Sequence, residues 1–223
     1  MGHPLFVRPH TSYIAVVQEL LWEKAYLPVV QRSPRPVKAI LDLGGNVGYS
    51  VRFWQKQFPD AEIVVVEPDP KNYRQLRKNI EIGGHAQWVQ TIHALVGAKP
   101  GEAFLDRSAN CESMLRMSEA EARGSIRIVK KTVPDLLKLF SHGNGRVDVL
   151  KCDIEGTEVE LFADCRSWID RIGYLTDELH SPYNAAEFQE HLRAAGVRME
   201  KPWISAKPGC AALACSRIRP QSP

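Results

Sequence analysis

The chain has 223 residues, of which 44% are hydrophobic and 25% charged, a composition typical of one soluble globular domain. Its net charge of +3 is too small to predict the dense basic face of a nucleic-acid-binding protein, and no apolar run is long enough to span a membrane. The first residues lack the apolar core of a signal peptide, and the five cysteines form no C-x-x-C pair. We therefore expect a cytoplasmic protein with reduced thiols and with neither nucleic-acid nor membrane partners.

Residues 1–36 are expected to form a helical lead-in to the main domain. Apolar residues recur at helical spacing between Ser12 and Leu27, and Ser12 is a suitable N-cap. The prolines of residues 31–36 then predict a linker. We expect the remaining residues, 37–223, to fold as a single domain.

The stretch of residues 39–50 predicts a strand, a tight turn and the start of a helix. Residues 39–43 are mostly apolar, as in a strand that is buried on both faces. Glycines then interrupt the run at positions 44, 45 and 48, and apolar residues recur at helical spacing as far as Phe58. A turn of this kind leaves backbone amides open at the helix N-terminus, where they can bind a small polar ligand.

The residues around this turn discriminate among three classes of ligand. A nucleotide phosphate loop requires a Lys-Ser or Lys-Thr pair after its glycines, and none follows here. In the dinucleotide fingerprint G-x-G-x-x-G, Leu43 would occupy the place of the first glycine, and the carboxylate of Asp42 would lie near the pyrophosphate. A carboxylate at this point suits a cationic cofactor such as S-adenosylmethionine, which carries an ammonium and a sulfonium. An NAD(P)-dependent oxidoreductase is the alternative from another reaction class.

A second acidic residue follows roughly 20 residues after the turn. Glu67 comes directly after the apolar run of residues 63–66, at the carboxyl end of the expected neighbouring strand, where it can accept hydrogen bonds from ribose hydroxyls. Residues 68–69, which begin the next helix, and residues 94–95, at the end of the third strand, are expected to flank the adenosine. The candidate cofactor-binding residues are therefore Asp42, Gly44, Gly45, Asn46, Gly48, Tyr49, Ser50, Glu67, Pro68, Asp69, Ala94 and Leu95.

Residues 97–143 fit a simple alternation of strands and helices least well. Two short strand-like pieces, residues 103–106 and 125–130, flank a polar stretch. We predict a small antiparallel hairpin insertion around residues 100–131, with a mobile tip that is a candidate lid over the site.

The second half of the chain contains two strands that end in polar residues. The apolar run of residues 147–152 is followed by Asp153 and Glu155, and the run of residues 172–179 closes on Glu178 and His180. Because the carboxyl ends of parallel strands meet at one edge of a sheet, we expect these four side chains on the side of the cofactor.

The helices and strands around these runs complete the predicted fold. Thr157 and Glu160 have the spacing of a capping box, and the helix that they open should carry Val159 and Phe162 inward. Residues 197–204 and 210–218 predict a terminal hairpin. The alternation of strands and helices predicts an α/β fold with a doubly wound, mostly parallel sheet.

Four stretches of the sequence are similar to the FkbM-type family of S-adenosylmethionine-dependent methyltransferases. They are ILDLGGNVGYS, VVVEPDPKNYRQLRKN, VDVLKCDIEGTEVELF and the later strand that ends in ELH. The resemblance covers nearly the whole chain, and one departure is Gly45, where the family often has alanine. It implies a seven-stranded, Rossmann-like class I methyltransferase fold. It also implies O-methylation of a hydroxyl on a sugar, polyketide, lipid or other small metabolite, but leaves the acceptor unidentified.

In such an enzyme the sulfonium already makes the methyl group electrophilic. The protein then has to position the reactants and remove the acceptor's proton. We expect His180 to act as the base, oriented by Glu178, with Asp153 at the acceptor hydroxyl. Glu155 is a further catalytic candidate, although an acid at this point also suits the start of a helix.

Two alternatives remain open at this stage. Asp153, Glu178 and His180 could together bind a divalent cation that acidifies the acceptor hydroxyl, although their spacing in sequence does not establish that they meet. The chain could also bind S-adenosylmethionine without catalysing a reaction and act through a partner. The oligomeric state has no signature in the sequence.

Overall fold

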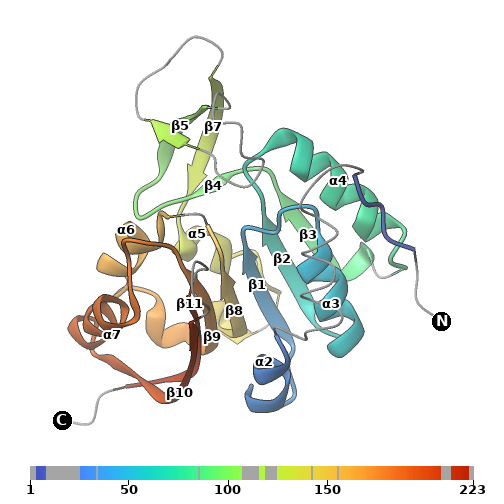
Figure 1. Ribbon diagram of the computed structural model, residues 1–223. Helices are drawn as coiled ribbons and strands as arrows, with labels where there is room; N and C mark the ends of the chain where they lie inside the picture. Colours follow the sequence, from blue (N-terminus) through green and yellow to red (C-terminus); the bar gives the residue numbers. More distant parts are fainter. Residues whose placement is uncertain are drawn as a thin grey trace.

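Seven strands form one central sheet in the computed structural model (Figure 1). The structure describes residues 4–8, 26–33, 35–84, 86–106, 116–118, 125–141, 143–154, 156–206 and 212–220. In spatial order the strands are β10 (Val197–Ala206), β11 (Ala212–Pro220), β9 (Ile172–Leu179), β8 (Val147–Cys152), β1 (Ala39–Leu43), β2 (Glu62–Val66) and β3 (Val89–Ile92). The strands from β9 to β3 are parallel, whereas β11 is antiparallel to both β9 and β10. This architecture confirms the predicted doubly wound sheet and its terminal antiparallel hairpin.

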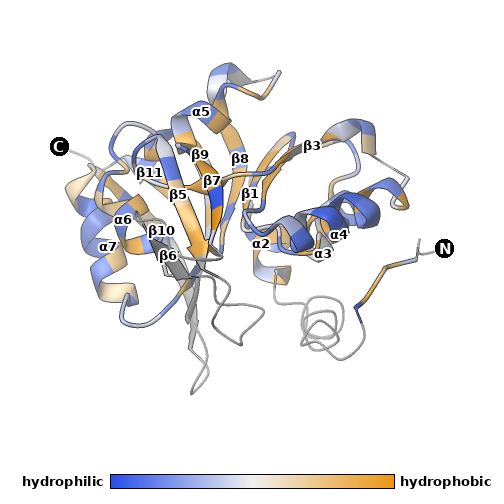
Figure 2. Cartoon of the chain, turned by 90° about the horizontal axis from the view of Figure 1, so that it is seen from above, coloured by the Kyte–Doolittle hydropathy of each residue, from blue (hydrophilic) through white to orange (hydrophobic). Residues whose placement is uncertain are grey.

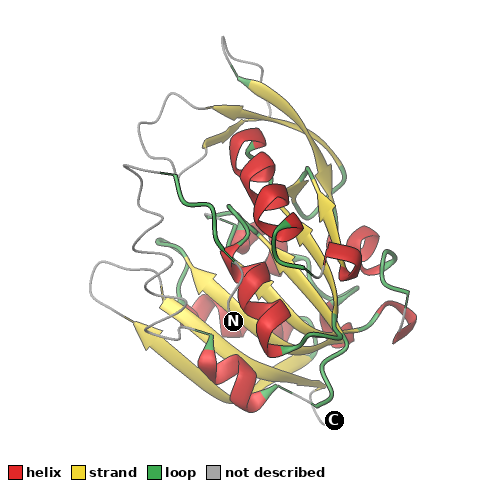
Figure 3. Ribbon diagram, turned by 90° about the vertical axis from the view of Figure 1, so that its right-hand side faces the viewer, coloured by secondary structure: helices red, strands yellow, loops and turns green. Residues whose placement is uncertain are grey.

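The central strands are apolar because helices cover both faces of the sheet. All five residues of β1 are buried, and Leu41 pairs in register with Val64 of β2 and Leu150 of β8. Side chains of successive residues along β1 enter opposite core layers, so that Ile40 and Leu41 belong to different clusters. Figure 3 shows the helices on the two sides of the twisted sheet.

Each face of the sheet carries its own set of helices. The first set is α2 (Leu27–Arg32), α3 (Tyr49–Gln57) and α4 (Pro70–Glu81), and the second is α5 (Val133–Leu137), α6 (Glu158–Ala163) and α7 (Ala185–Ala194). Short 3-10 turns lie at η1 (Ala86–Trp88), η2 (Gly143–Gly145) and η3 (Ile169–Arg171). The apolar sides of the helices face the sheet, and their polar sides face outward (Figure 2).

A second, smaller sheet stands at the carboxyl edge of the central sheet, because its first strand follows shortly after the end of β3 (Figure 1). It has the order β4 (Leu95–Val96), β7 (Ile126–Lys131), β5 (Gly101–Asp106) and β6 (Arg116–Ser118). The predicted hairpin is thus present as β5 and β7, but it is enlarged by β6 and by β4, which runs parallel to β7. Most of its connecting segments lie outside the described residues, so the role as a lid stays a prediction.

The predicted N-terminal helix lies mostly outside the described residues. Of the lead-in, the structure describes residues 4–8 and the segment that contains α2. Residues 4–8 contact α3 and α4: the amide of Phe6 donates to Asn79 Oδ1 (2.7 Å), and Tyr49 Oη donates to the carbonyl of Phe6 (3.1 Å). Among the described residues, no helix combines the length and the apolar character needed to cross a bilayer.

Candidate functional site

The glycine turn after β1 packs tightly against the neighbouring strands. Gly44 has a φ of +77°, and a Cβ at this position would lie 1.7 Å from the carbonyl oxygen of Asp153. A Cβ at Gly45 would lie 2.2 Å from Val65 Cγ2. The amides of Gly44 and Gly45 donate to the carbonyl of Val66 at 3.0 and 2.9 Å, and therefore these two amides, which we expected to be open, are engaged within the protein.

Asp42 is fully buried beneath this turn. Its Oδ2 accepts a hydrogen bond from Trp54 Nε1 (3.1 Å), and its Oδ1 lies 3.4 Å from Lys151 Nζ. Burial raises the pKa of Asp42, and the Lys151 ammonium opposes this effect. These contacts make Asp42 a partner of protein groups directly below the turn.

Lys151 connects the glycine turn after β1 with Asp153 after β8. This residue was not selected from the sequence. Its buried ammonium donates to the carbonyl of Gly44 (2.6 Å) and lies 3.2 Å from Asp153 Oδ2. Burial disfavours the ammonium, but the carboxylates of Asp153 and Asp42 outweigh this effect and hold the pKa of Lys151 well above its usual value. The available signal was a lysine near the end of a mostly apolar strand, β8.

Glu67 is buried directly after β2. Its Oε1 accepts from the amide of Asp69 and its Oε2 from the amide of Asn46, both at 2.8 Å. Burial raises the pKa of Glu67 to about 8, although both backbone hydrogen bonds lower it. These bonds fix the carboxyl group between the glycine turn and the start of α4.

Several of the other cofactor candidates are buried or bound to protein groups. Ala94 and Leu95 are buried, Ser50 hydrogen-bonds to Asp42, and the side chain of Asp69 caps α4. Beside Pro68, the sequence reasoning overlooked an aromatic pair. The rings of Tyr73 and His93 stack with centroids 4.8 Å apart, and His93 Nε2 lies 3.0 Å from the carbonyl oxygen of Pro68.

At the ends of β8 and β9, the structure brings together three of the four catalytic candidates. Asp153, Glu178 and His180 each offer one donor atom within 4.8 Å of the others. His180 Nε2 lies 3.9 Å from Asp153 Oδ1, and these two side chains are 18% and 25% exposed. The fourth candidate, Glu155, lies outside the described residues.

The orienting contact on His180 Nδ1 comes from a residue that we had not selected. Glu158 Oε1 lies 2.8 Å from this nitrogen. Glu178 offers an oxygen within 4.8 Å of His180, and its expected role in orienting the ring stays a prediction. The predicted inward position of Val159 is wrong, because its side chain is 42% exposed and Glu158 is buried instead. Thr157 makes no side-chain cap hydrogen bond, so the predicted capping box is also absent. Phe162 is buried, as expected.

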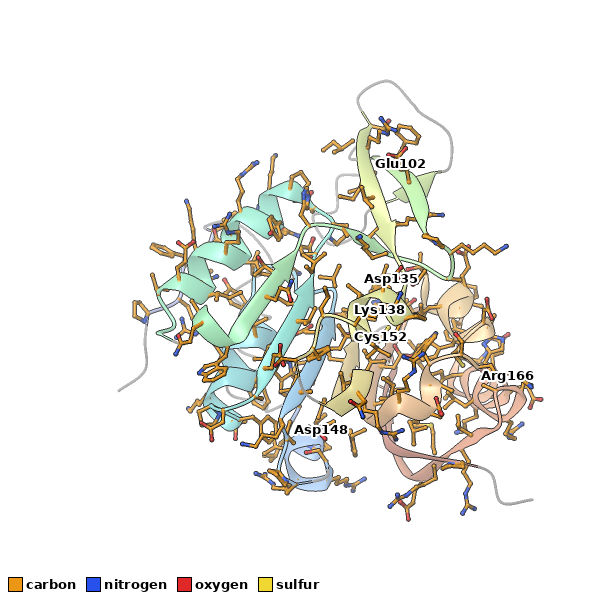
Figure 4. The ribbon with its side chains drawn as sticks, turned by 180° about the vertical axis from the view of Figure 1, so that it is seen from behind. Glu102, Asp135, Lys138, Asp148, Cys152 and Arg166 are labelled. Carbon is orange, nitrogen blue, oxygen red and sulfur yellow. The ribbon has the colours of Figure 1, made fainter. Side chains whose placement is uncertain are left out.

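Below this group lies a second buried carboxyl, Asp177. Burial and the nearby charge of Glu158 raise the pKa of Asp177 well above its usual value. It neighbours Cys152, which is labelled in Figure 4 and whose pKa burial also raises. The thiols of Cys152 and Cys165 are both unpaired.

Two carboxylates and an imidazole are donor types that divalent cations accept. Asp153, Glu178 and His180 could therefore hold such an ion. It would share Asp153 with the Lys151 ammonium, which lies 3.2 Å from Oδ2 and disfavours a further positive charge at this point.

Comparisons with known proteins find a methyltransferase family and methyltransferase relatives. The model of the methyltransferase FkbM domain matches residues 42–198. Methyltransferase sdnD of Sordaria araneosa is 23% identical over 150 residues, which cover 55% of this chain and 58% of that protein. Methyltransferase 1 of Beauveria bassiana is 21% identical over 186 residues, which cover 73% of this chain and 74% of that protein. The chain thus spans little more than half of the length of sdnD.

Solved structures share the fold. The METTL16 MTase domain aligns with a TM-score of 0.52 at 15% identity, over 92% of this chain and 65% of that chain. A putative O-methyltransferase from Klebsiella pneumoniae aligns with a TM-score of 0.52 at 13% identity, over 95% of this chain and 83% of that chain. The N-terminal domain of human METTL16, solved in complex with SAH, aligns with a TM-score of 0.52 at 13% identity. The alignment covers 96% of this chain and 75% of that chain. Because the family model spans most of the chain, from β1 into β10, the chain belongs to the FkbM methyltransferase domain family.

Proposed function

We propose that this protein transfers a methyl group from S-adenosylmethionine to a hydroxyl oxygen of a small-molecule acceptor. One observation carries the proposal: polar groups after β1 and β2 lie on the same edge of the sheet as those after β8 and β9, and Lys151 contacts both sets. Ligands of doubly wound sheets bind at this edge. Membership in a methyltransferase family supports the transferred group.

The cofactor half is proposed to lie around the glycine turn. Glu67 would accept hydrogen bonds from the ribose, as its fixed position between Asn46 and Asp69 allows. Carboxylates outnumber the ammonium of Lys151 in its immediate surroundings, which favours a cofactor that brings positive charge. The SAH complex of the METTL16 domain supports the same cofactor class.

The acceptor half is proposed to lie between Asp153 and His180. An acceptor hydroxyl held there would donate to one of these side chains while its oxygen faces the methyl group. We propose that Asp153 binds the acceptor hydroxyl and that His180 is the base that removes the proton of this hydroxyl. Positioning can supply several kcal/mol of the rate acceleration, and a general base typically adds about 10²- to 10⁴-fold.

The acceptor is proposed to be a hydroxylated small metabolite such as a sugar, a polyketide or a lipid, met in the cytoplasm. The net charge of +3 gives no support for a nucleic-acid substrate. The residues that select the acceptor would lie in loops around the edge, including those of the small sheet.

Calorimetric titration tests the proposal most directly. The purified protein is titrated with S-adenosylmethionine and separately with NADH, each with and without a chelator. We expect micromolar binding of S-adenosylmethionine alone, followed by transfer of a labelled methyl group to members of a panel of hydroxylated acceptors. Binding of NADH instead would indicate an oxidoreductase, and cofactor binding without turnover on any acceptor would indicate a protein that acts through a partner.

A further inference from the structure

Glu158 is a buried carboxylate at the start of α6, and the helix does not require that this carboxylate be buried. It is the first residue of α6, where an acid is favourable against the helix dipole even when it is exposed. The next residues of the helix, Val159 and Glu160, are both exposed, but Glu158 is fully buried. Because a charged side chain is almost never buried unless it is paired, its partner is the informative feature.

The partner of Glu158 that can carry a charge is His180. Glu158 Oε1 lies 2.8 Å from His180 Nδ1 and also accepts from the amide of Ile154 at 3.2 Å. Its other oxygen, Oε2, has no hydrogen-bond partner within the described residues. Burial and the charge of Glu158 raise the pKa of the nearby Asp177, which disfavours a second negative charge beside Glu158.

This contact decides which ring nitrogen carries the proton. An ionised carboxylate only accepts hydrogen bonds, so Nδ1 of His180 must be the protonated nitrogen. Nε2 is then the accepting nitrogen, and it lies 3.9 Å from Asp153 Oδ1, which is also an acceptor. A hydroxyl placed between two accepting atoms can donate to either of them.

We propose that Glu158 is a positioning residue for the base His180: it fixes the Nδ1–H tautomer and stabilises the imidazolium that forms during methyl transfer. In that step the acceptor's O–H bond breaks and its proton moves to Nε2. The oxygen forms a bond to the methyl carbon as the bond from carbon to sulfur breaks, which yields S-adenosylhomocysteine and the methyl ether. The catalytic part rests on the proposed function, whereas the pairing of Glu158 with His180 does not.

The charges around the pair are compatible with this role. Asp153 follows β8 and Glu178 lies on β9, and each offers a carboxylate oxygen within 4.8 Å of a ring nitrogen of His180. Asp177 lies on the side of Glu158, and the ammonium of Lys151 is held by Asp153 and Asp42. An imidazolium at His180 would therefore be surrounded mainly by carboxylates, which favour it.

The first test needs no acceptor. Protein labelled with ¹⁵N in its seven histidines is examined by NMR correlation of ring nitrogens and carbon-bound protons, and H180Q identifies the signals of His180. We expect the Nδ1-protonated tautomer in the wild type and its loss in E158Q, while E160Q, which changes an exposed acid on the same helix, leaves it unchanged. An Nε2-protonated ring in the wild type, or an unchanged ring in E158Q, would overturn the proposal.

The second test uses turnover on an acceptor found in the panel. E158Q should lower kcat by about 10²- to 10⁴-fold, the range of a general base, and move the acidic limb of the pH–rate profile to lower pH. E158D should recover part of the rate, and calorimetric binding of S-adenosylhomocysteine should show that each variant is folded. An E158Q enzyme that is only less stable, with an unshifted pH profile, would indicate a merely structural role and overturn the proposal.

A third measurement separates a base from a metal ligand. Titration with Mn²⁺ should leave the His180 signals sharp, because the proposal gives the Nε2 lone pair to the acceptor. Selective broadening of these signals at low Mn²⁺ concentration would assign the lone pair to a cation and overturn the role as base. If the tautomer result holds but no acceptor is methylated, the proposed function fails and the pairing stands.

Discussion

The two halves of the carboxyl edge differ in how deeply their carboxylates and the imidazole are buried. In the cofactor half, Asp42 and Glu67 are almost fully buried: Glu67 accepts two backbone hydrogen bonds, and Asp42 accepts one from Trp54 and forms an ion pair with Lys151. In the acceptor half, Asp153 and His180 keep 25% and 18% of their side-chain surface exposed. This difference agrees with the proposed roles, in which the buried half holds the cofactor and the more open half admits the acceptor.

The largest effect on both halves is expected from replacing Lys151, whose ammonium contacts Asp42 in one half and Asp153 in the other. We expect K151M to lose about 3–5 kcal/mol of unfolding free energy, because Asp42 and Asp153 would face each other without compensation. Urea denaturation followed by circular dichroism measures the loss.

The matched control for this variant is K138M. Lys138 is 72% exposed and its ammonium lies 3.0 Å from Asp135; both residues are labelled in Figure 4. An exposed pair is worth at most about 1 kcal/mol, so K138M should unfold almost as the wild type does. Equal losses in the two variants would contradict the role assigned to Lys151.

Removal of the base should affect the acceptor half alone. H180A is expected to lower kcat on an identified acceptor by about 10²- to 10⁴-fold. Its calorimetric affinity for S-adenosylmethionine should stay within about twofold of the wild type, since the hydrogen bonds described for the glycine turn run to Val66, Lys151 and Glu67. If H180A and D153N both kept full turnover, the assignment of this half would be wrong.

The fold could be predicted from the sequence because its strongest signals are local. Strands buried on both faces appear as apolar runs, and the cap of Asp69 and the capping box of Asn184 and Glu187 mark helix starts. The small sheet was only partly predictable. Its strand β4 has two residues, and its pairing with the distant β7 leaves no local pattern.

The site was predictable only where topology determines it. Asp153, Glu178 and His180 meet because the carboxyl ends of neighbouring parallel strands share an edge. Lys151 and Glu158 were missed because hydropathy patterns place apolar residues inward and give no weight to a charged residue that is buried with a partner. On that basis Val159 was predicted to face inward, but Glu158 is the buried residue at this turn of the helix.

A smaller effect is expected in the cofactor half, where Glu67 is one of several contacts. E67Q should weaken S-adenosylmethionine binding about tenfold, or roughly 1.4 kcal/mol, because the amide is a poorer acceptor for ribose hydroxyls. Its control is E62Q at the opposite end of the same strand, where Glu62 accepts from the amide of Ser141. Unchanged affinity in E67Q would remove Glu67 from the cofactor site.

The same carboxyl group predicts how the stability of the ligand-free protein depends on pH. The pKa of Glu67 is about 8 in the folded protein, against 4.5 for an ordinary glutamate, so the native state binds its proton more tightly than the unfolded state does. This contribution to stability is complete below pH 4.5, declines by about 1.4 kcal/mol per pH unit above it, and is absent above pH 8.

Urea midpoints between pH 5 and 8 measure this decline for the wild type and for E67Q. Asp177 has a raised pKa of the same origin and persists in both proteins, so the difference between their slopes isolates Glu67. We expect the slope of E67Q to be flatter, because the amide does not titrate. Parallel slopes would show that Glu67 is already ionised in the folded protein, and the cofactor half would then have to stabilise a buried charge through the amides of Asn46 and Asp69 alone.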